Sequence, residues 1–239
     1  PAIPEPAKIR FRELYRIAPV GVLGCAAVGM ANGAFWSFAP LFAHARSAST
    51  MEVSLFMSAC VLGTAVFQWP LGRFSDRLDR RWVILGTSGV AVAMALLLVL
   101  QWSASFGSLL LLGALFGASA LSLYALCVAD ANDRADSNAF IEVSSRTLFI
   151  YGLGSSSGAF LAGLVIAAVG MAGLFVYTAL VHGVLAILVY HQIRTRGPTP
   201  AAERAVYSPQ GPVAHETQAA IALKPGAEQV QEQGEESDQ

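Results

Sequence analysis

The stretch Gly72–Arg81 reads GRFSDRLDRR and places six charged side chains between two long apolar runs. Neither the preceding run, Val53–Leu71, nor the following run, Trp82–Ala129, carries a charge. Because a charge at the centre of a bilayer costs at least about 2.5 to 3.5 kcal/mol, this stretch must lie at a membrane surface. The sequence therefore predicts a short polar connection between two membrane-spanning helices.

The composition supports a membrane protein with several spans. Hydrophobic residues make up 55% of the chain and charged residues only 13%, whereas soluble domains contain about 25% charged residues. The formal net charge of -1 gives no support for nucleic-acid binding. Cys25, Cys60 and Cys127 lie inside apolar runs without paired spacing, so we expect packing roles for them. We expect neither a disulfide, a metal site nor a cofactor.

The apolar runs predict six helices, since about 20 apolar residues are needed to cross the hydrocarbon. Polar or glycine-containing turns at Gln101–Ser105 and Val169–Gly173 divide the two longest runs. The runs do not alternate with a period of two, which excludes a closed barrel. The predicted spans are Ile17–Ala43, Val53–Leu71, 82–101, 106–129, 147–169 and 172–193.

The distribution of basic residues predicts the orientation. When six helices alternate, every basic-rich segment falls on one side, which the positive-inside rule assigns to the cytoplasm together with both termini. The first loop has only Arg46 on the opposite side. The basic residues on the predicted cytoplasmic side are Lys8, Arg10, Arg12, Arg16, Arg73, Arg77, Arg80, Arg81, Arg134, Arg146, Arg194 and Arg196.

These patterns divide the chain into three parts. We expect a cytoplasmic linker segment at 1–16, a six-helix transmembrane domain at 17–196 and a disordered cytoplasmic tail at 197–239. The tail contains several prolines and ends rich in Glu and Gln, a composition typical of disorder. A partner-binding role for it stays open. The first residue is Pro1 rather than Met, which favours a fragment or a processed chain.

The charged stretch resembles a signature loop of the major facilitator superfamily, usually written G-x-L-x-D-R-x-G-R-R/K. The matching residues are Gly72, Asp76, Arg77, Arg80 and Arg81, whereas Phe74 and Asp79 depart from the pattern. In that family the loop joins the second and third helices of a six-helix half, as it does here. The resemblance implies an all-α membrane fold, with six helices as two inverted three-helix repeats. It also implies a secondary active transporter working by alternating access, with this chain as the C-terminal half.

The resemblance gives the loop a role as a conformational-switch latch. Asp76 is expected to face a helix N-terminus, where an anion is favoured, and the arginines to pair with carboxylates or with lipid headgroups. An ordinary positive-inside loop is the alternative interpretation. Asp130, Glu142 and Arg146 border the fourth loop and are expected to join the same cytoplasmic charge network. The segment Gly154–Gly158 predicts close helix packing and resembles the glycine-rich eleventh helix of such transporters.

Polar and aromatic residues at mid-depth are candidates for the substrate cavity, which the resemblance places between the two halves. They are Asn32, Trp36, Ser58, Tyr124 and Tyr151. Interhelical hydrogen bonding by Asn32 and packing of the aromatic residues are alternative roles. No Asp, Glu, Lys or Arg lies mid-span, so a coupling acid would belong to the missing half. The expected partners are a small-molecule solute, membrane lipid and an N-terminal transporter half, in a bacterial inner membrane.

Two other classes of protein fit six helices. Gly117–Ala120 and His182 resemble the serine and histidine placement of rhomboid-type intramembrane proteases, where a Ser–His dyad serves nucleophilic catalysis. Ala120 replaces the glycine of that motif, and the charged loop has no place in that fold. A non-transporting membrane scaffold is the other alternative. We therefore expect a transporter and no enzyme.

Overall fold

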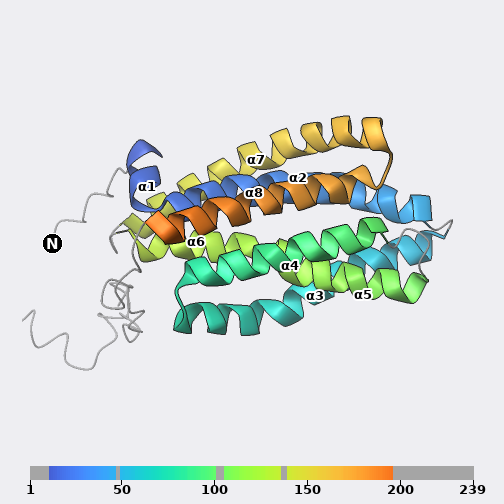
Figure 1. The fold of residues 1–239 in the computed structure, drawn as a ribbon, viewed down its shortest axis with the longest axis horizontal. Coiled ribbons are helices and arrows are strands. Elements are labelled where there is room, and N and C mark those ends of the chain that lie inside the picture. The colour runs from blue at the N-terminus through green and yellow to red at the C-terminus, as the bar shows by residue number, and fades with distance from the viewer. Residues whose placement is uncertain (1–10, 47–48, 101–104, 136–138, 196–239) are drawn as a thin grey trace, which may run out of the picture. The chain divides into compact units, whose positions relative to one another are not determined.

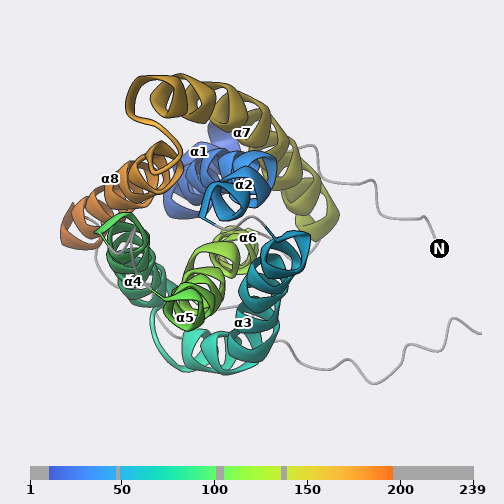
Figure 2. The same cartoon turned by 90° about the vertical axis from the view of Figure 1, so that its right-hand side faces the viewer.

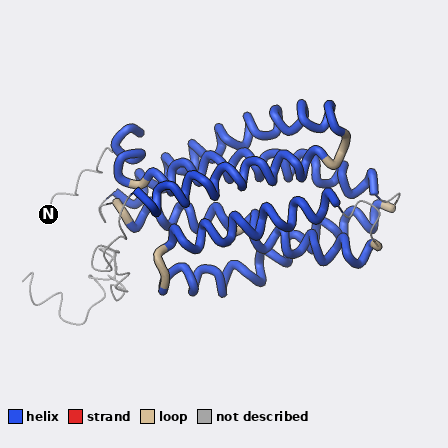
Figure 3. Tube along the Cα trace, viewed as in Figure 1, coloured by secondary structure: helices blue, strands red, loops and turns tan. Residues whose placement is uncertain are grey.

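The computed structural model describes residues 11–46, 49–100, 105–135 and 139–195. The predicted tail 197–239, most of the predicted linker, most of the turn at Gln101–Ser105 and the basic residues Lys8, Arg10 and Arg196 lie outside the described residues. Within these ranges the chain is helical and contains no strand (Figure 3).

Six helical stretches are long and apolar enough to cross a membrane, which confirms the predicted all-helical class and the number of spans (Figure 1). Long apolar runs become helices in lipid because the helix satisfies every backbone polar group internally. A short helix, α1, precedes them, and the fourth span is divided into α5, η1 and α6. The helices are α1 (Phe11–Ile17), α2 (Pro19–Arg46), α3 (Thr50–Arg77), α4 (Arg80–Leu100), α5 (Phe106–Phe116), η1 (Gly117–Leu121), α6 (Leu123–Asp133), α7 (Phe140–Val169) and α8 (Gly173–Thr195).

The helices extend beyond the apolar runs that predicted them. Helix α3 continues to Arg77 and α7 begins at Phe140, so residues assigned to loops lie in terminal helical turns. Polar residues continue a helix past the hydrocarbon when they pair along it, as Glu142 and Arg146 do at 2.8 Å. The predicted turn at Val169–Gly173 is confirmed. It contains Gly170 at φ +83°, a conformation that a side chain disfavours.

Glycines set the closest helix contacts. Helix α2 packs along α7, where a Cβ added to Gly33 or Gly158 would lie closer than 3.0 Å to backbone atoms of the other helix. The same holds between α3 and the fourth span at Gly63 and Gly117. Small residues allow this approach. The predicted packing face at Gly154–Gly158 is therefore present.

The arginines gather at one end of the helix bundle. The start of α2, the α3–α4 connection, the end of α6, the start of α7 and the end of α8 lie at one end of the bundle (Figure 1). Among the described residues, all arginines except Arg46 lie in helical turns at that end or, for Arg134, directly after one. The end-on view places α2 and α6 inside the bundle, with α3 and α7 on either side of them (Figure 2).

Candidate functional site

The connection between α3 and α4 is only two residues long, Leu78 and Asp79. The Asp79 carboxylate accepts a hydrogen bond from the backbone N–H of Arg81 at 3.1 Å, the arrangement of a helix N-terminal cap. It also accepts from the Arg81 guanidinium, with 2.8 Å between Nη2 and Oδ2. The carboxylate at the start of α4 therefore belongs to Asp79, a residue that departs from the family motif, and not to Asp76 as expected.

The Asp79–Arg81 pair is largely removed from water. The side chain of Arg81 is 3% exposed and that of Asp79 is 14% exposed. Burial raises the pKa of Asp79, but the hydrogen bonds and charge of Arg81, with the charge of Arg134, outweigh it. The net effect holds the pKa of the Asp79 carboxyl below its usual value.

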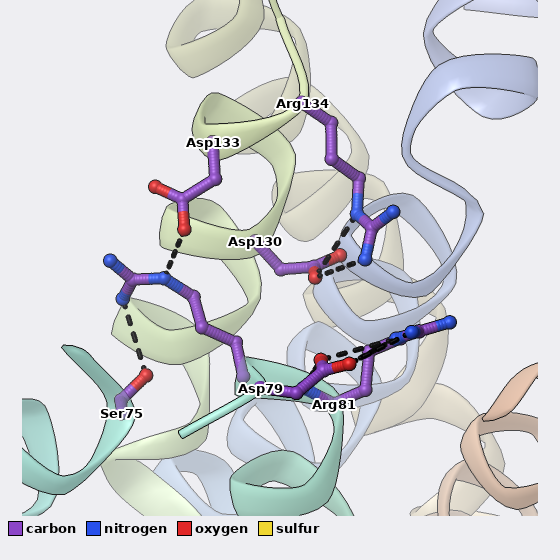
Figure 4. Close-up of polar contacts among 7 residues, drawn as sticks. Ser75, Asp79, Arg81, Asp130, Asp133 and Arg134 are labelled. Carbon is purple, nitrogen blue, oxygen red and sulfur yellow. Dashed lines mark hydrogen bonds and ion pairs between the residues drawn. The ribbon is translucent and has the colours of Figure 1, made fainter. Parts of the chain in front are cut away.

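Arg80 connects the end of α3 to the end of α6. Its Nε donates to Oδ2 of Asp133 on α6 in a close ion pair. The other guanidinium nitrogens donate to Oγ of Ser75 at 3.2 Å and to Oδ1 of Asp76 at 3.1 Å, both on α3. Figure 4 shows the bonds to Asp133 and Ser75. One arginine thus holds two helices of the bundle together at their charged ends.

A further carboxylate, Asp130, lies on α6 beside the Asp79–Arg81 pair (Figure 4). It is 2% exposed, and its Oδ1 accepts from Nε and Nη2 of Arg134, each at 3.2 Å. Its Oδ2 is buried without a hydrogen-bond partner among the described residues. In Figure 4 the Asp130–Arg134 pair lies next to the Asp79–Arg81 pair. We call Asp79, Arg80, Arg81, Asp130, Asp133 and Arg134 the charge cluster.

The structure places the remaining charged candidates at the edge of the cluster or away from it. Asp76 is 67% exposed in its side chain and contacts the cluster through Arg80. Arg77 is exposed and forms no ion pair within the described part of the chain. Glu142 and Arg146 pair with each other, and Arg146 lies over the Phe11 ring at 4.6 Å. They are therefore not brought into the cluster, and Gly72 has no neighbour close enough to require a glycine.

The sequence did not single out Asp79, Asp133 and Arg134. Asp79 was read as a departure from a motif, although an Asp just before a helix is a capping signal. Asp133 and Arg134 stand in the acidic segment that follows the fourth span. The available signal for their pairing with the α3–α4 connection was the presence of opposite charges at two helix ends on one side of the membrane.

A pocket of about 370 Å³ lies near the middle of the helices, and four of the five predicted cavity residues line it. They are Asn32 and Trp36 on α2, Tyr124 on α6 and Tyr151 on α7. The fifth, Ser58, is exposed on α3 and does not line the pocket. The other lining residues are Val61, Thr64, Ala65, Gln68 and Leu121.

Direct contacts hold the polar and aromatic walls of the pocket. Asn32 Nδ2 donates to the Tyr151 hydroxyl at 3.3 Å, which links α2 to α7. The Tyr151 ring packs on that of Tyr124, with 4.5 Å between centroids. Trp36 is 50% exposed and meets the buried Phe35 ring edge to face at 5.3 Å. These contacts therefore fix the positions of the Asn32, Trp36, Tyr124 and Tyr151 side chains.

The α3 wall contains two polar residues that the sequence reading missed. Thr64 donates to the backbone carbonyls of Cys60 and Gly117, each at 2.9 Å. Gly117 begins η1, a π-helical turn of the kind found often at functional sites. Gln68 follows Thr64 by four residues, one helical turn further along the same face. That spacing of polar residues in an apolar span was the available signal.

The geometry does not favour a protease. Ser119 donates to the carbonyls of Leu115 and Phe116, and Nδ1 of His182 bonds to the carbonyl of Thr178 at 2.7 Å. Within the described ranges, the serine and the histidine do not hydrogen-bond to each other. A nucleophile needs its base within such reach.

Comparisons with known proteins agree with this fold. A family model described as Major Facilitator Superfamily matches residues 21–225. The uncharacterized MFS-type transporter YcaD of Escherichia coli O17:K52:H18 is 27% identical over 143 residues, which are 60% of this chain and 36% of that protein. The uncharacterized MFS-type transporter Ent638_1421 of Enterobacter sp. (strain 638) has the same identity and the same shares. The chain thus aligns with little more than a third of the length of these relatives.

Proposed function

The chain belongs to the Major Facilitator Superfamily, and from this premise we propose that it is the C-terminal half of a secondary active transporter for a small solute. The transporter works by alternating access, in which two six-helix halves rock around a solute held between them. The observation that carries the proposal is the pocket at mid-depth, to which α2, α3, α6 and α7 each contribute a polar or aromatic side chain.

The pairing of the helices supports two inverted three-helix repeats. A two-fold axis between the repeats would exchange the first span with the fourth, the second with the fifth and the third with the sixth. A contact between the first and fifth spans must then have an equivalent contact between the fourth and second spans. The corresponding contacts, α2 with α7 and α3 with α5 and η1, are both close and both rely on glycines. The third and sixth spans, α4 and α8, are also in contact, and the same two-fold axis would leave this pair of helices unchanged.

The exposed faces of α3 and α7 are where the other half belongs. These two spans are the least buried of the six, and they lie on either side of α2 and α6 (Figure 2). Both helices also line the pocket, α3 with Val61, Thr64, Ala65 and Gln68 and α7 with Tyr151. Covering this face with a second six-helix half closes the pocket from that side.

The charge cluster serves as the latch of this half at the cytoplasmic surface. Its ion pairs fix the α3–α4 connection to the end of α6, while Asp76 and Arg77 project outward, where a partner half can bind them in one state and release them in another. The orientation follows from the arginines at this end. Both termini are then cytoplasmic, in a bacterial inner membrane.

The coupling acid, if the transporter uses a proton, belongs to the other half. The pocket lining contains no Asp, Glu, Lys, Arg or His, and intramembrane ionisable residues mark ion pathways in transporters.

The test compares three bacterial cultures: one with an empty vector, one expressing this chain alone and one expressing the complete gene that contains it. Untargeted mass spectrometry measures small solutes in cells and medium. At least one solute should change its distribution only with the complete protein. The same change with the chain alone, or no change with the complete protein, would contradict the proposal, and the latter result would favour a scaffold.

A further inference from the structure

An apolar groove lies at the charged end of the bundle, between α3 and α4, and it shares no residue with the mid-depth pocket. We propose that this groove binds one acyl chain of an anionic phospholipid from the membrane leaflet at that end, with the lipid phosphate beside Arg73. The proposal rests on the membrane-spanning fold and is independent of any transported solute. It concerns a lipid that stays bound to the protein, as distinct from the lipid that surrounds every span.

One stripe of α3 is close-packed at its start and uncovered at its end. Residues spaced three or four apart share one face of a helix. Along this face Phe56 and Cys60 are fully buried, and a Cβ on Gly63 would overlap backbone atoms of Ala114 on α5. The continuation of the stripe lines the groove with Phe67, Leu71, Phe74 and Leu78. Phe67 is 48% exposed and Phe74 is 61% exposed, so the apolar face continues where the close packing stops.

Pro70 stands in this part of α3, between Phe67 and Leu71. A proline inside a helix removes one backbone hydrogen bond and bends the helix. Both views place the end of α3 at the outer edge of the bundle (Figures 1 and 2). Helix α4 forms the opposite wall of the groove, with Trp82 and Val90 among its lining residues, and α5 and η1 complete a volume of about 380 Å³. We attribute the groove to the bend at the proline.

The groove is as long as one leaflet is deep. From Phe67 to Leu78, α3 rises about 16 Å at 1.5 Å per residue. The hydrocarbon core of a bilayer is roughly 30 Å thick, so each leaflet contributes about 15 Å. None of the lining residues carries a charge, and the groove ends where the charged connection between α3 and α4 begins. One extended acyl chain therefore matches both the length and the chemistry of the groove.

Two exposed side chains suit the polar part of the lipid. Trp82 lines the groove and is 54% exposed, and within the described ranges its indole N–H has no hydrogen-bond acceptor. Tryptophan is enriched at the level of lipid headgroups. Arg73 is exposed as well, and its guanidinium lies over the Trp69 ring, 5.2 Å from the centroid. Guanidinium groups pair well with phosphate, and anionic headgroups are attracted to the basic residues of this end.

The other half of the transporter meets a different side of α3. The mid-depth pocket uses Val61, Thr64, Ala65 and Gln68, a strip about 100° around the helix from the groove stripe. A half that closes the pocket therefore leaves the groove open toward the lipid. A second copy of the protein is the other candidate occupant, and a measurement of mass distinguishes it from a lipid.

The test measures phospholipid binding to the purified complete transporter by native mass spectrometry. The probes are dioleoyl phosphatidylglycerol, which is anionic, and dioleoyl phosphatidylcholine, which is zwitterionic. Gly86→Phe fills the groove, because Gly86 lines it and a Cβ there meets nothing within 4 Å. Gly89→Phe is the matched control on the same helix, since a Cβ there is equally free and Gly89 does not line the groove.

Wild type and Gly89→Phe should bind one phosphatidylglycerol with the same apparent Kd. Gly86→Phe should weaken this binding about tenfold or more, because the acyl chain loses buried area. Val90→Trp narrows the groove from the same wall at an exposed position and should act in the same direction, which covers the case of a Gly86→Phe protein that does not fold. Arg73→Ala should reduce the preference for phosphatidylglycerol over phosphatidylcholine.

The proposal is overturned if the folded groove variants bind phosphatidylglycerol as the wild type does, if the wild type prefers phosphatidylcholine, or if Arg73→Ala keeps the full preference. A dimer mass that disappears only in the groove variants would also overturn it, because the occupant would then be a second copy of the protein. Each of these results leaves the proposed transport function standing, because the comparison of culture solutes tests transport separately.

Discussion

Asn32 and Tyr151 join the first and fifth spans at mid-depth, with the amide nitrogen of Asn32 donating to the tyrosine hydroxyl at 3.3 Å. The residues are 119 positions apart in the chain, and both line the pocket. The contact occurs just where glycines let α2 and α7 approach, since a Cβ at Gly29 would collide with the backbone of Tyr151. Close packing and the pocket are therefore parts of the same arrangement.

Replacing Tyr151 by Phe separates the structural and functional roles of this contact. Interhelical hydrogen bonds in membranes contribute about 0.6 kcal/mol on average, so Tyr151→Phe should remain folded with nearly the same unfolding temperature. Uptake by the complete transporter should fall at least several-fold if the hydroxyl also contacts solute. If Tyr151→Phe and the wild type took up solute at the same rate, the Tyr151 hydroxyl would have no role in transport and the residue would serve only in helix packing.

Arg80 and Asp133 should be energetically coupled. Alanine substitutions made singly and together form a double-mutant cycle, for which we expect a coupling of about 1 kcal/mol between the two partly buried groups. The readout is the free energy of unfolding of the complete transporter in detergent. A second cycle that combines Arg77→Ala with Asp133→Ala is the matched control, and it should show no coupling because Arg77 forms no ion pair with Asp133 among the described residues. Additive effects of Arg80→Ala and Asp133→Ala would show that the pair does not hold α3 to α6.

Asp79→Asn should lower the free energy of unfolding at neutral pH by about 1 to 3 kcal/mol, because it removes a charged hydrogen-bond partner from the largely buried Arg81 guanidinium. The lowered pKa of Asp79 adds a pH dependence. A carboxyl with a depressed folded-state pKa stabilises the fold above its unfolded pKa, near 3.8, and this stability disappears as the pH falls toward the folded value. As the pH falls from about 5 to below 3.8, the wild type should therefore lose more free energy of unfolding than Asp79→Asn. Parallel pH curves would contradict the burial of this pair.

Gly158→Ala and Gly152→Ala test the α2–α7 contact on a single helix. A Cβ at position 158 would overlap the Met30 backbone, whereas one at position 152 meets nothing within 4 Å. Overpacking costs about 1 to 3 kcal/mol, so only Gly158→Ala should lower the unfolding temperature measurably. Equal unfolding temperatures for the two variants would mean that the helices do not approach this closely.

Asp76→Asn should reduce turnover more than membrane insertion. Asp76 is exposed, and among the described residues only Arg80 bonds to it, at 3.1 Å. Its replacement should therefore remove little stability while it alters a group available to the other half. Uptake rate and the amount of protein in the membrane are measured on the same vesicles. If the uptake rate and the amount of membrane-inserted protein fell in proportion, Asp76 would have no role in the latch.

The sequence was sufficient for features that depend on local pattern. Apolar run lengths predicted the six spans, and the charged stretch Gly72–Arg81 located the connection between the second and third spans. Helix ends were not predictable this way, because ion pairs such as Glu142–Arg146 continue a helix beyond its apolar run.

Contacts between distant elements were harder to predict. Mid-depth position identified Asn32, Trp36, Tyr124 and Tyr151, but hydropathy does not say which face of a helix turns inward, so Ser58 was included while Thr64 and Gln68 were missed. The partners of Arg80 could not be predicted either, because its pairing with Asp133 requires the start of α4 to lie beside the end of α6.

The central claim is that the pocket opens to each side of the membrane in turn, and cysteine accessibility at Gln68 tests it most directly. The complete transporter carrying Gln68→Cys is exposed to a membrane-impermeant maleimide in intact cells and in inverted vesicles. The unsubstituted protein provides the background, since Cys25, Cys60 and Cys127 of this chain are buried. Alternating access should give labelling above background from both sides, whereas labelling from one side only, or from neither, would exclude it.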